Sequence, residues 1–171
     1  MNKIITISRE FGSGGKEVGK RLADTLGYAY YDSEIINLLV KETGMSESYI
    51  ENISEKGIYP FAFQFGKTFT ASYLLQKNQT DILVKQTKIL KQIAEKGNAI
   101  IVGRGANVIL KDYNIVNIFV YANMDSKIKR CKKKAPKDEN LTDKELINKI
   151  KSIDKNRKAF NNLISSTEWG S

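Results

Sequence analysis

The sequence predicts an α/β fold of three layers, in which helices cover both faces of a parallel β-sheet. Two observations carry this prediction. Short apolar runs alternate with longer segments whose apolar residues repeat at helical spacing, as in βαβ units. Glycine-rich turns follow two of the runs, GSGG after the first and GRG after a later one. The 171 residues, 41% of them hydrophobic, suit a single domain spanning 1–171.

The N-terminal part predicts two strand–helix units. Residues 3–8 (KIITIS) have the character of a buried strand, and the helix that follows repeats apolar residues until Gly27 ends it. Residues 28–32 predict a second strand, followed by a helix that ends at Gly44. Because strands joined through a helix run parallel, we expect a parallel sheet.

The middle of the chain predicts two helices around an irregular segment. Ser46 can cap a helix that runs to about Ile53. Residues 57–66 are aromatic, contain a proline and show no clear period, so we expect a loop or irregular insert there. The apolar pattern of 80–96 predicts an amphipathic helix that Gly97 ends.

The last two predicted strands differ in length. Residues 98–106 (NAIIVGRGA) repeat the strand-to-glycine pattern of the first unit, and 114–122 form the longest apolar run of the chain. A long apolar run is typical of a strand buried on both faces. We therefore expect four strands, with 114–122 in a central position.

Two charged helices complete the predicted fold. Asp125 is a candidate cap for a helix running through Arg130. Thr142 and Glu145 have the spacing of a capping box at the start of a basic helix that reaches about Leu163.

The amino-acid inventory limits the possible chemistry. The chain has no histidine and a single cysteine, Cys131. This excludes an internal disulfide, zinc fingers, and catalysis by Ser-His pairs or histidine bases. Any catalysis must use Lys, Arg, Asp, Glu or backbone amides. The chain also shows no apolar stretch long enough for a membrane span and no N-terminal leader pattern, so we expect a cytoplasmic protein without membrane partners.

The charge balance points to phosphorylated or polyanionic ligands. The net charge is +9, from 28 basic and 19 acidic residues. Arginine is scarce, and its planar guanidinium makes bidentate phosphate contacts that lysine cannot copy. The arginines are therefore the first candidates for phosphate binding: Arg9, Arg21, Arg104, Arg130 and Arg157. The phase of the first helix places Arg21 on its exposed side.

The segment after the first strand, SREFGSGGKEVGKR, predicts a phosphate cradle. Glycines between a strand and a helix let backbone amides surround an anion at the helix N-terminus. The dinucleotide pattern fails because Glu17 occupies its third glycine position. The Gly15-Lys16 pair matches a P-loop, which is a different phosphate-binding motif, although Glu10 and Glu17 replace its first glycine and its hydroxyl residue. The alternative is a glycine-rich turn without a ligand.

Nearly the whole chain resembles the cytidylate kinase-like family of nucleoside monophosphate kinases. The resemblance runs from ITISREFGSGGKEVGKRLADTLGYAYYDSEII through IIVGRGA and IFVYANMDSKIKRCKKK to IDKNR and TEWG. It implies a P-loop kinase fold with a helical substrate-side insert at about 44–78 and a basic lid at about 132–141. It also implies ATP-dependent phosphoryl transfer, with Mg²⁺, to a nucleoside monophosphate, with CMP or dCMP as the expected acceptor.

The resemblance implies roles for individual residues. Lys16, Arg130 and Arg157 would be catalytic, the two arginines flanking the lid. Asp32, Arg104 and Asp154 would bind the acceptor. The phosphates of ATP would be bound by the glycine segment, comprising Gly12, Ser13, Gly14, Gly15, Lys16 and Glu17.

Alternatives stay open at several of these positions. Asp32 is equally suited to cap the helix that follows it, and Arg130 and Arg157 can be solvated helix charges. Asp154 can orient Arg157, three residues later on the same helical face, or pair with it at the surface.

Magnesium binding departs from the family pattern. Val102 stands where the family carries an acidic residue, so Glu17 is the candidate metal ligand. The arginine that the family carries beyond Asp32 is also missing, with Leu38 near that place. Selectivity for cytosine therefore does not follow from the sequence.

A second function stays open, namely a non-catalytic nucleotide-binding regulator with a degenerate magnesium site. Nucleic-acid binding through KIKRCKKK is disfavoured, because no aromatic residues interleave with the lysines. The oligomeric state is not predictable from these features.

Overall fold

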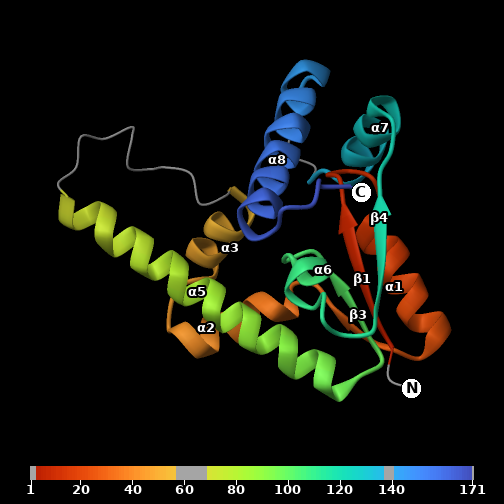
Figure 1. The fold of residues 1–171 in the computed structure, drawn as a ribbon. Coiled ribbons are helices and arrows are strands. Elements are labelled where there is room, and N and C mark those ends of the chain that lie inside the picture. Colours follow the sequence, from red (N-terminus) through yellow and green to blue (C-terminus); the bar gives the residue numbers. More distant parts are fainter. Residues whose placement is uncertain (1–2, 57–68, 137–140, 171) are drawn as a thin grey trace.

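A computed structural model describes residues 3–56, 69–136 and 141–170. Its strands form one parallel sheet in the order β2-β3-β1-β4 (Figure 1). The strands are β1 (Ile4–Arg9), β2 (Ala29–Tyr31), β3 (Ala99–Val102) and β4 (Ile115–Val120). The predicted α/β fold with a parallel sheet is confirmed.

Helices cover both faces of this sheet (Figure 1). α1 packs on one face, and α2, α5 and α6 pack on the other. In the described part of the chain, no helix combines the length and apolarity needed to cross a membrane. The helices are α1 (Gly15–Leu26), α2 (Glu34–Thr43), α3 (Glu47–Lys56), α5 (Phe69–Lys96), α6 (Ala106–Ile109), α7 (Met124–Lys134) and α8 (Asp143–Ile164).

The strand β1 is buried on both faces and divides the core in two. Ile5 and Ile7 point to the α1 side, where they pack with Ala23. Ile4 points to the opposite side, in the larger cluster that contains Leu90 of α5. Successive side chains of a strand alternate between faces, so a continuous apolar run lets β1 contact both layers.

The helix predicted at 80–96 is longer than its apolar pattern indicates. α5 begins at Phe69 and ends at Lys96. No glycine or proline occurs within it, so nothing in the local sequence stops the helix at Thr80. The segment 57–66, predicted as an irregular insert, lies outside the described residues.

The prediction of a central position for 114–122 is wrong for the described sheet. β4 lies at the edge, paired only with β1 among the described strands. Several of its side chains face solvent, and Val116 is 52% exposed. Apolar content alone does not distinguish an edge strand from a central one, because strand order is a property of the tertiary fold.

The ends of the last two helices were only partly predicted. Asn123, not Asp125, caps α7, and its side chain accepts a hydrogen bond from Ser126 N at 2.9 Å. α7 also continues to Lys134 instead of ending near Arg130. The predicted capping box of Thr142 and Glu145 is confirmed at the start of α8.

Candidate active site

Two glycine-containing turns lie at the carboxyl edge of the sheet. The first, here called the glycine loop, comprises residues 10–14 between β1 and α1. The second, here called the Gly-Arg-Gly turn, comprises residues 103–105 between β3 and α6. β1 and β3 are parallel neighbours, so both turns lie at the edge where ligands bind in open α/β sheets.

The glycine loop has the backbone shape of an anion-binding turn. Gly12 and Gly14 have φ values of 75° and 94°, which side-chain-bearing residues rarely adopt. Gly14 is the N-cap of α1 and supplies no side-chain cap, so the first-turn amides remain available to a ligand. Ser13, predicted to contact phosphate, instead donates its hydroxyl hydrogen bond to Glu10 O at 2.9 Å and so closes the loop.

A cavity of about 690 Å³ lies against this loop. Its walls come from the glycine loop, the first turn of α1, α7 and the segment after it, and α8 from its N-cap to Arg157. Only Glu10 and Glu17 among its lining residues are acidic. The basic lining residues are Arg9, Lys16, Arg130, Lys132, Lys134, Lys149 and Arg157. A cavity of this size and charge fits a nucleotide polyphosphate.

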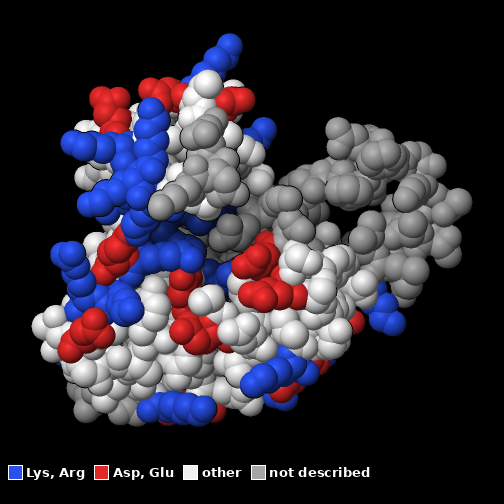
Figure 2. Space-filling model, turned by 180° about the vertical axis from the view of Figure 1, so that it is seen from behind, with Lys and Arg blue, Asp and Glu red and all other residues white. Residues whose placement is uncertain are grey.

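Most of the net charge of the chain lies on α7 and α8, two of the helices that line this cavity. α7 carries six basic and one acidic residue, and α8 carries six basic and three acidic residues. Figure 2 shows Lys and Arg side chains gathered over this part of the molecule. The two helices therefore account for eight of the nine net positive charges of the chain.

Lys16 follows the loop and pairs with the end of β2. Its ammonium lies 2.7 Å from Asp32 Oδ2, and Arg9 Nη2 lies 3.8 Å from Asp32 Oδ1. Asp32 is buried, whereas the Lys16 side chain is 58% exposed. The helix cap of α2 is Ser33, so Asp32 does not act as that cap. An exposed lysine beside the loop is able to turn toward a bound anion.

Tyr30 packs beside this pair, and burial raises its pKa to about 12, with the negative charges of Asp32 and Glu34 adding to the effect. The Tyr30 hydroxyl donates a hydrogen bond to Lys16 O at 3.4 Å. Tyr30 is therefore protonated at neutral pH and contributes no charge to the site.

The two arginines that flank the predicted lid both approach the loop. Arg130 is exposed and lies over Gly14, where an added Cβ would come within 3.0 Å of its guanidinium carbon. Arg157 is only 12% exposed, donates a hydrogen bond to Arg9 O at 3.3 Å, and lies 5.8 Å from the Phe11 ring centroid. Arg157 is therefore not a solvated surface charge.

Arg104 belongs to a second, smaller pocket of about 50 Å³. Its φ is 59°, and Gly103 and Gly105 beside it are also left-handed. Buried Gln86 of α5 donates a hydrogen bond to Arg104 O at 2.9 Å, which holds this turn. A polar residue within the apolar stripe of α5 was the sequence signal for this contact. The small pocket shares Arg9 and Arg157 with the large cavity.

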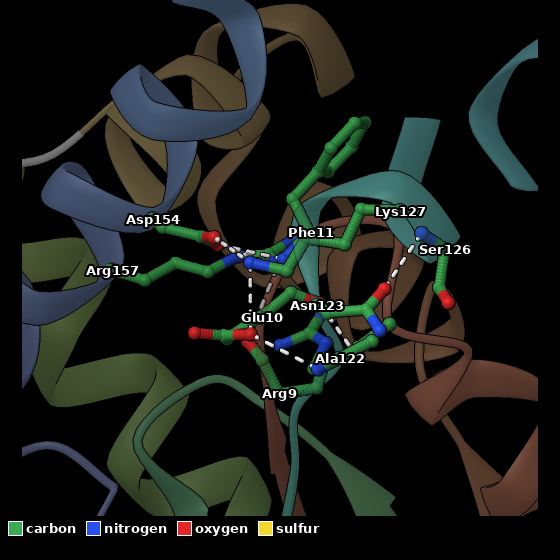
Figure 3. Close-up of polar contacts among 10 residues, drawn as sticks. Arg9, Glu10, Phe11, Ala122, Asn123, Ser126, Lys127, Asp154 and Arg157 are labelled. Carbon is green, nitrogen blue, oxygen red and sulfur yellow. Dashed lines mark hydrogen bonds and ion pairs between the residues drawn. The ribbon is translucent and has the colours of Figure 1, made fainter. Parts of the chain in front are cut away.

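A buried polar cluster connects the loop with α7 and α8 (Figure 3). Lys127 Nζ lies 2.8 Å from Glu10 Oε2 and 3.1 Å from Asp154 Oδ2, and Asp154 Oδ1 accepts a 2.6 Å hydrogen bond from Phe11 N. Burial lowers the pKa of Lys127, but the bonds with Glu10 and Asp154 outweigh it, so the pKa is raised. Lys127 is therefore charged at neutral pH.

Sequence analysis missed Lys127, because nothing in a lysine-rich segment marks which lysine is buried. Asp154 was predicted to orient Arg157 or to pair with it at the surface. The structure places Asp154 Oδ1 4.0 Å from Arg157, but its shorter bonds are those to the loop amide and Lys127.

The fit to the expected ligands differs between ATP and Mg²⁺. The basic cavity and the uncapped first turn of α1 suit the phosphates of ATP. Glu17 lines the same cavity, but its carboxylate pairs with Lys134. Among the described residues, no cluster of three metal-ligating side chains occurs. Mg²⁺ commonly uses one or two carboxylates together with substrate phosphates, so this donor set suits a metal that arrives with the nucleotide.

The predicted lid region at 132–141 begins as helix. Lys132 and Lys134 belong to the last turn of α7 and pair with Asp143 of α8 and with Glu17 of α1, respectively. Residues 137–140 lie outside the described residues. The described ends of the region therefore bridge the helices on either side of the cavity.

The family of this chain follows from its similarity to known proteins. The model of the cytidylate kinase-like family matches residues 4–171. The chain belongs to this family. Membership supports phosphoryl transfer involving nucleotides in general, together with the use of ATP and Mg²⁺ in general, and leaves the acceptor open.

Several solved structures have a fold similar to that of this protein. An uncharacterized protein from Eubacterium ventriosum is 27% identical, with a TM-score of 0.66, and the match covers 98% of this chain and 81% of that one. Shikimate kinase from Bacteroides thetaiotaomicron is 20% identical, with a TM-score of 0.52, over 96% of this chain and 85% of that one. The second match shows a shared fold only. No curated protein matches the sequence.

Proposed function

We propose that this protein transfers a phosphoryl group from ATP to a nucleoside monophosphate, with CMP or dCMP as the acceptor. One observation carries the proposal: a large basic cavity at the glycine loop adjoins a small pocket at Arg104, and both pockets include Arg9 and Arg157. Two anion sites with shared cations match the need to bring a donor and an acceptor phosphate together.

The donor side uses the glycine loop and the cations around it. The amides at the start of α1 bind phosphate oxygens, and Arg130 lies above Gly14, where it reaches the same anion. Lys16 leaves Asp32 and neutralises charge on the transferred group. Mg²⁺ bound to the phosphates would supply further charge neutralisation, with Glu17 as the candidate protein ligand.

The acceptor side uses the ends of β2 and β3. Arg104, which lines the small pocket, is the candidate contact to the phosphate of the acceptor, and Asp32, released from Lys16, is a candidate acceptor of hydrogen bonds from its sugar or base. Asp154 was predicted as a third contact, but it lines neither pocket, and its oxygens bind Phe11 N and Lys127. Arg157 lies between the two pockets, where it is placed to stabilise charge on the group in transit. CMP and dCMP are proposed on the family resemblance, since no contact to a base is described.

The test is a coupled ADP-release assay with ATP and Mg²⁺ against CMP, dCMP, UMP, AMP and GMP. We expect turnover stimulated by CMP or dCMP and a loss of about a hundredfold or more in Lys16→Ala, because one preorganised charge is removed. Lys20→Ala, an exposed lysine on the same helix, is the matched control. Equal turnover in Lys16→Ala and the wild type would contradict the proposal.

A non-catalytic nucleotide-binding regulator is the second candidate. The observation that favours it is the pairing of Glu17, the candidate metal ligand, with Lys134. Tight ATP binding without turnover for any acceptor would select this function. Binding is measured by calorimetry on the wild type with and without Mg²⁺.

A further inference from the structure

A buried lysine joins the glycine loop to both helices of the large cavity (Figure 3). Lys127 of α7 is 5% exposed, and its ammonium contacts the carboxylates of Glu10 and Asp154. Three charged side chains from the loop, α7 and α8 therefore meet at a largely buried ammonium group, with the Glu10 side chain 26% exposed and the Asp154 side chain 15% exposed. Removing one partner from such a cluster is costly, because the remaining charges stay buried without compensation.

Both carboxylates also hold the main chain. Asp154 Oδ1 accepts a hydrogen bond from Phe11 N at 2.6 Å, and Glu10 Oε2 accepts one from Ala122 N at 3.2 Å. Each carboxylate thus binds Lys127 and one backbone amide. The peptide at which the chain leaves β1 and enters the loop is fixed relative to α7, α8 and the end of β4.

The same helices carry the two arginines of the site. Arg130 follows Lys127 by three residues on α7, and Arg157 follows Asp154 by three residues on α8. Their guanidinium groups lie at Gly14 and at Arg9 O. Lys127 itself is not among the residues that line the cavity. Its influence on a bound phosphate must pass through the groups that it holds.

We propose that Lys127 is a positioning residue: by binding Glu10 and Asp154, it sets the place of the glycine loop relative to Arg130 and Arg157. The effect of Lys127 on catalysis rests on the proposed phosphoryl transfer. Its effect on the geometry of the glycine loop does not rest on that function, because hydrogen exchange of the loop can be measured without turnover. Small displacements of reacting groups slow catalysis strongly, since a shift of about 1 Å can reduce the reaction rate about a hundredfold.

The test compares Lys127→Met, which removes the ammonium, with Lys127→Arg, which keeps the charge. Lys129→Met is the matched control, since Lys129 is exposed on the same helix. Three quantities are measured below the melting temperature of every variant: kcat and KM for ATP in the ADP-release assay, and the rate of hydrogen exchange of the Phe11 amide.

We expect Lys127→Met to lower kcat by about ten- to a hundredfold with a smaller change in KM. Exchange of the Phe11 amide should become faster. Lys127→Arg should recover part of both losses, and Lys129→Met should match the wild type. A role in stability alone would lower the melting temperature and leave kcat per folded molecule unchanged.

The proposal is overturned if folded Lys127→Met keeps the wild-type kcat or the wild-type exchange of Phe11. If that variant does not fold, Glu10→Gln carries the test, because it weakens the same contact at constant shape. Faster exchange and lower kcat support the proposal, and wild-type values overturn it. A wild type inactive with every acceptor would refute the proposed function, and the exchange of Phe11 would then decide the role of Lys127 alone.

Discussion

The glycine loop and the Gly-Arg-Gly turn are similar in composition and differ in what approaches their glycines. Gly14 of the loop faces the exposed guanidinium of Arg130 at the large cavity. Gly103 of the turn faces the buried guanidinium of Arg9, with which an added Cβ would overlap. In the first case the space opens onto the large cavity, and in the second it is filled by a side chain of the protein itself.

Because of this difference, substitutions at the two sites should affect different properties, ligand binding at Gly14 and stability at Gly103. At Gly14 of the loop, an added side chain meets the arginine at the surface, Arg130, so the main cost of a substitution there should fall on ligand binding. A substitution in the turn must displace a buried arginine that pairs with Asp32, so its main cost should fall on stability.

Gly103→Ala should give the largest effect. The new Cβ meets the Arg9 guanidinium, and the φ of 76° adds backbone strain. We expect a loss of about 3 kcal/mol in the free energy of unfolding, measured by urea denaturation. Gly44→Ala is the matched control, because Gly44 has a similar φ of 68° and no atom near its added Cβ. Equal losses in both variants would show that backbone strain alone decides the cost.

Gly14→Ala, unlike Gly103→Ala, should weaken ligand binding more than it lowers stability. The added Cβ meets the guanidinium of Arg130, a surface side chain that is able to give way, so the folding cost comes mainly from the backbone strain at a φ of 94°. We expect ATP affinity to fall about tenfold, which equals about 1.4 kcal/mol in binding free energy. The loss in the free energy of unfolding should be smaller than that of Gly103→Ala. Calorimetric titration measures the affinity. An unchanged Kd would mean that ATP phosphates do not use this part of the loop.

Gln86→Leu tests whether the turn also serves the acceptor. The variant removes the hydrogen bond to Arg104 O and leaves that carbonyl without the donor from α5. We expect a loss of about 1 kcal/mol in stability and a raised KM for the acceptor at unchanged ATP affinity. Gln92→Leu, an exposed position on the same helix, is the control. An unchanged acceptor KM would confine Gln86 to folding.

Thr142→Ala changes a helix cap outside both turns and should have the smallest effect. Hydrogen bonds from Thr142 lower the pKa of Glu145, so the folded state favours the carboxylate. This contribution is present above the unfolded-state pKa and is lost as the pH falls through the lowered value. We expect the melting temperature to fall by about 2 °C at neutral pH, with the difference shrinking in acid. A difference that is constant with pH would exclude the Glu145 contribution.

Local sequence signals predicted the elements around the site well. Four strands, the Thr142–Glu145 capping box and the glycine segment after β1 all follow from short-range patterns. Lys16, Arg130 and Arg157 were singled out in the sequence, and all three line the large cavity. The strands, the capping box and the glycine segment depend on residues that are neighbours in the chain, whereas Arg130 and Arg157 were singled out through the family resemblance.

Contacts between residues far apart in the chain could not be predicted from such local patterns. Lys127 is buried because Asp154 lies beside it from 27 residues away, and no periodicity encodes that pairing. The edge position of β4 depends on strand order, and the length of α5 depends on where no helix breaker occurs. Gln86 was visible only as a polar residue within an apolar stripe, whose partner could not be named.

Arg9 and Arg157 belong to both pockets, and this has a thermodynamic result. An anion in one pocket that draws Arg157 toward itself changes the charge that the other pocket offers to its ligand. Linkage then requires each ligand to change the affinity of the other by the same factor. If the proposed donor and acceptor occupy these two pockets, each is an effector of the other, and the affinity measured for either one has meaning only at a stated concentration of the other.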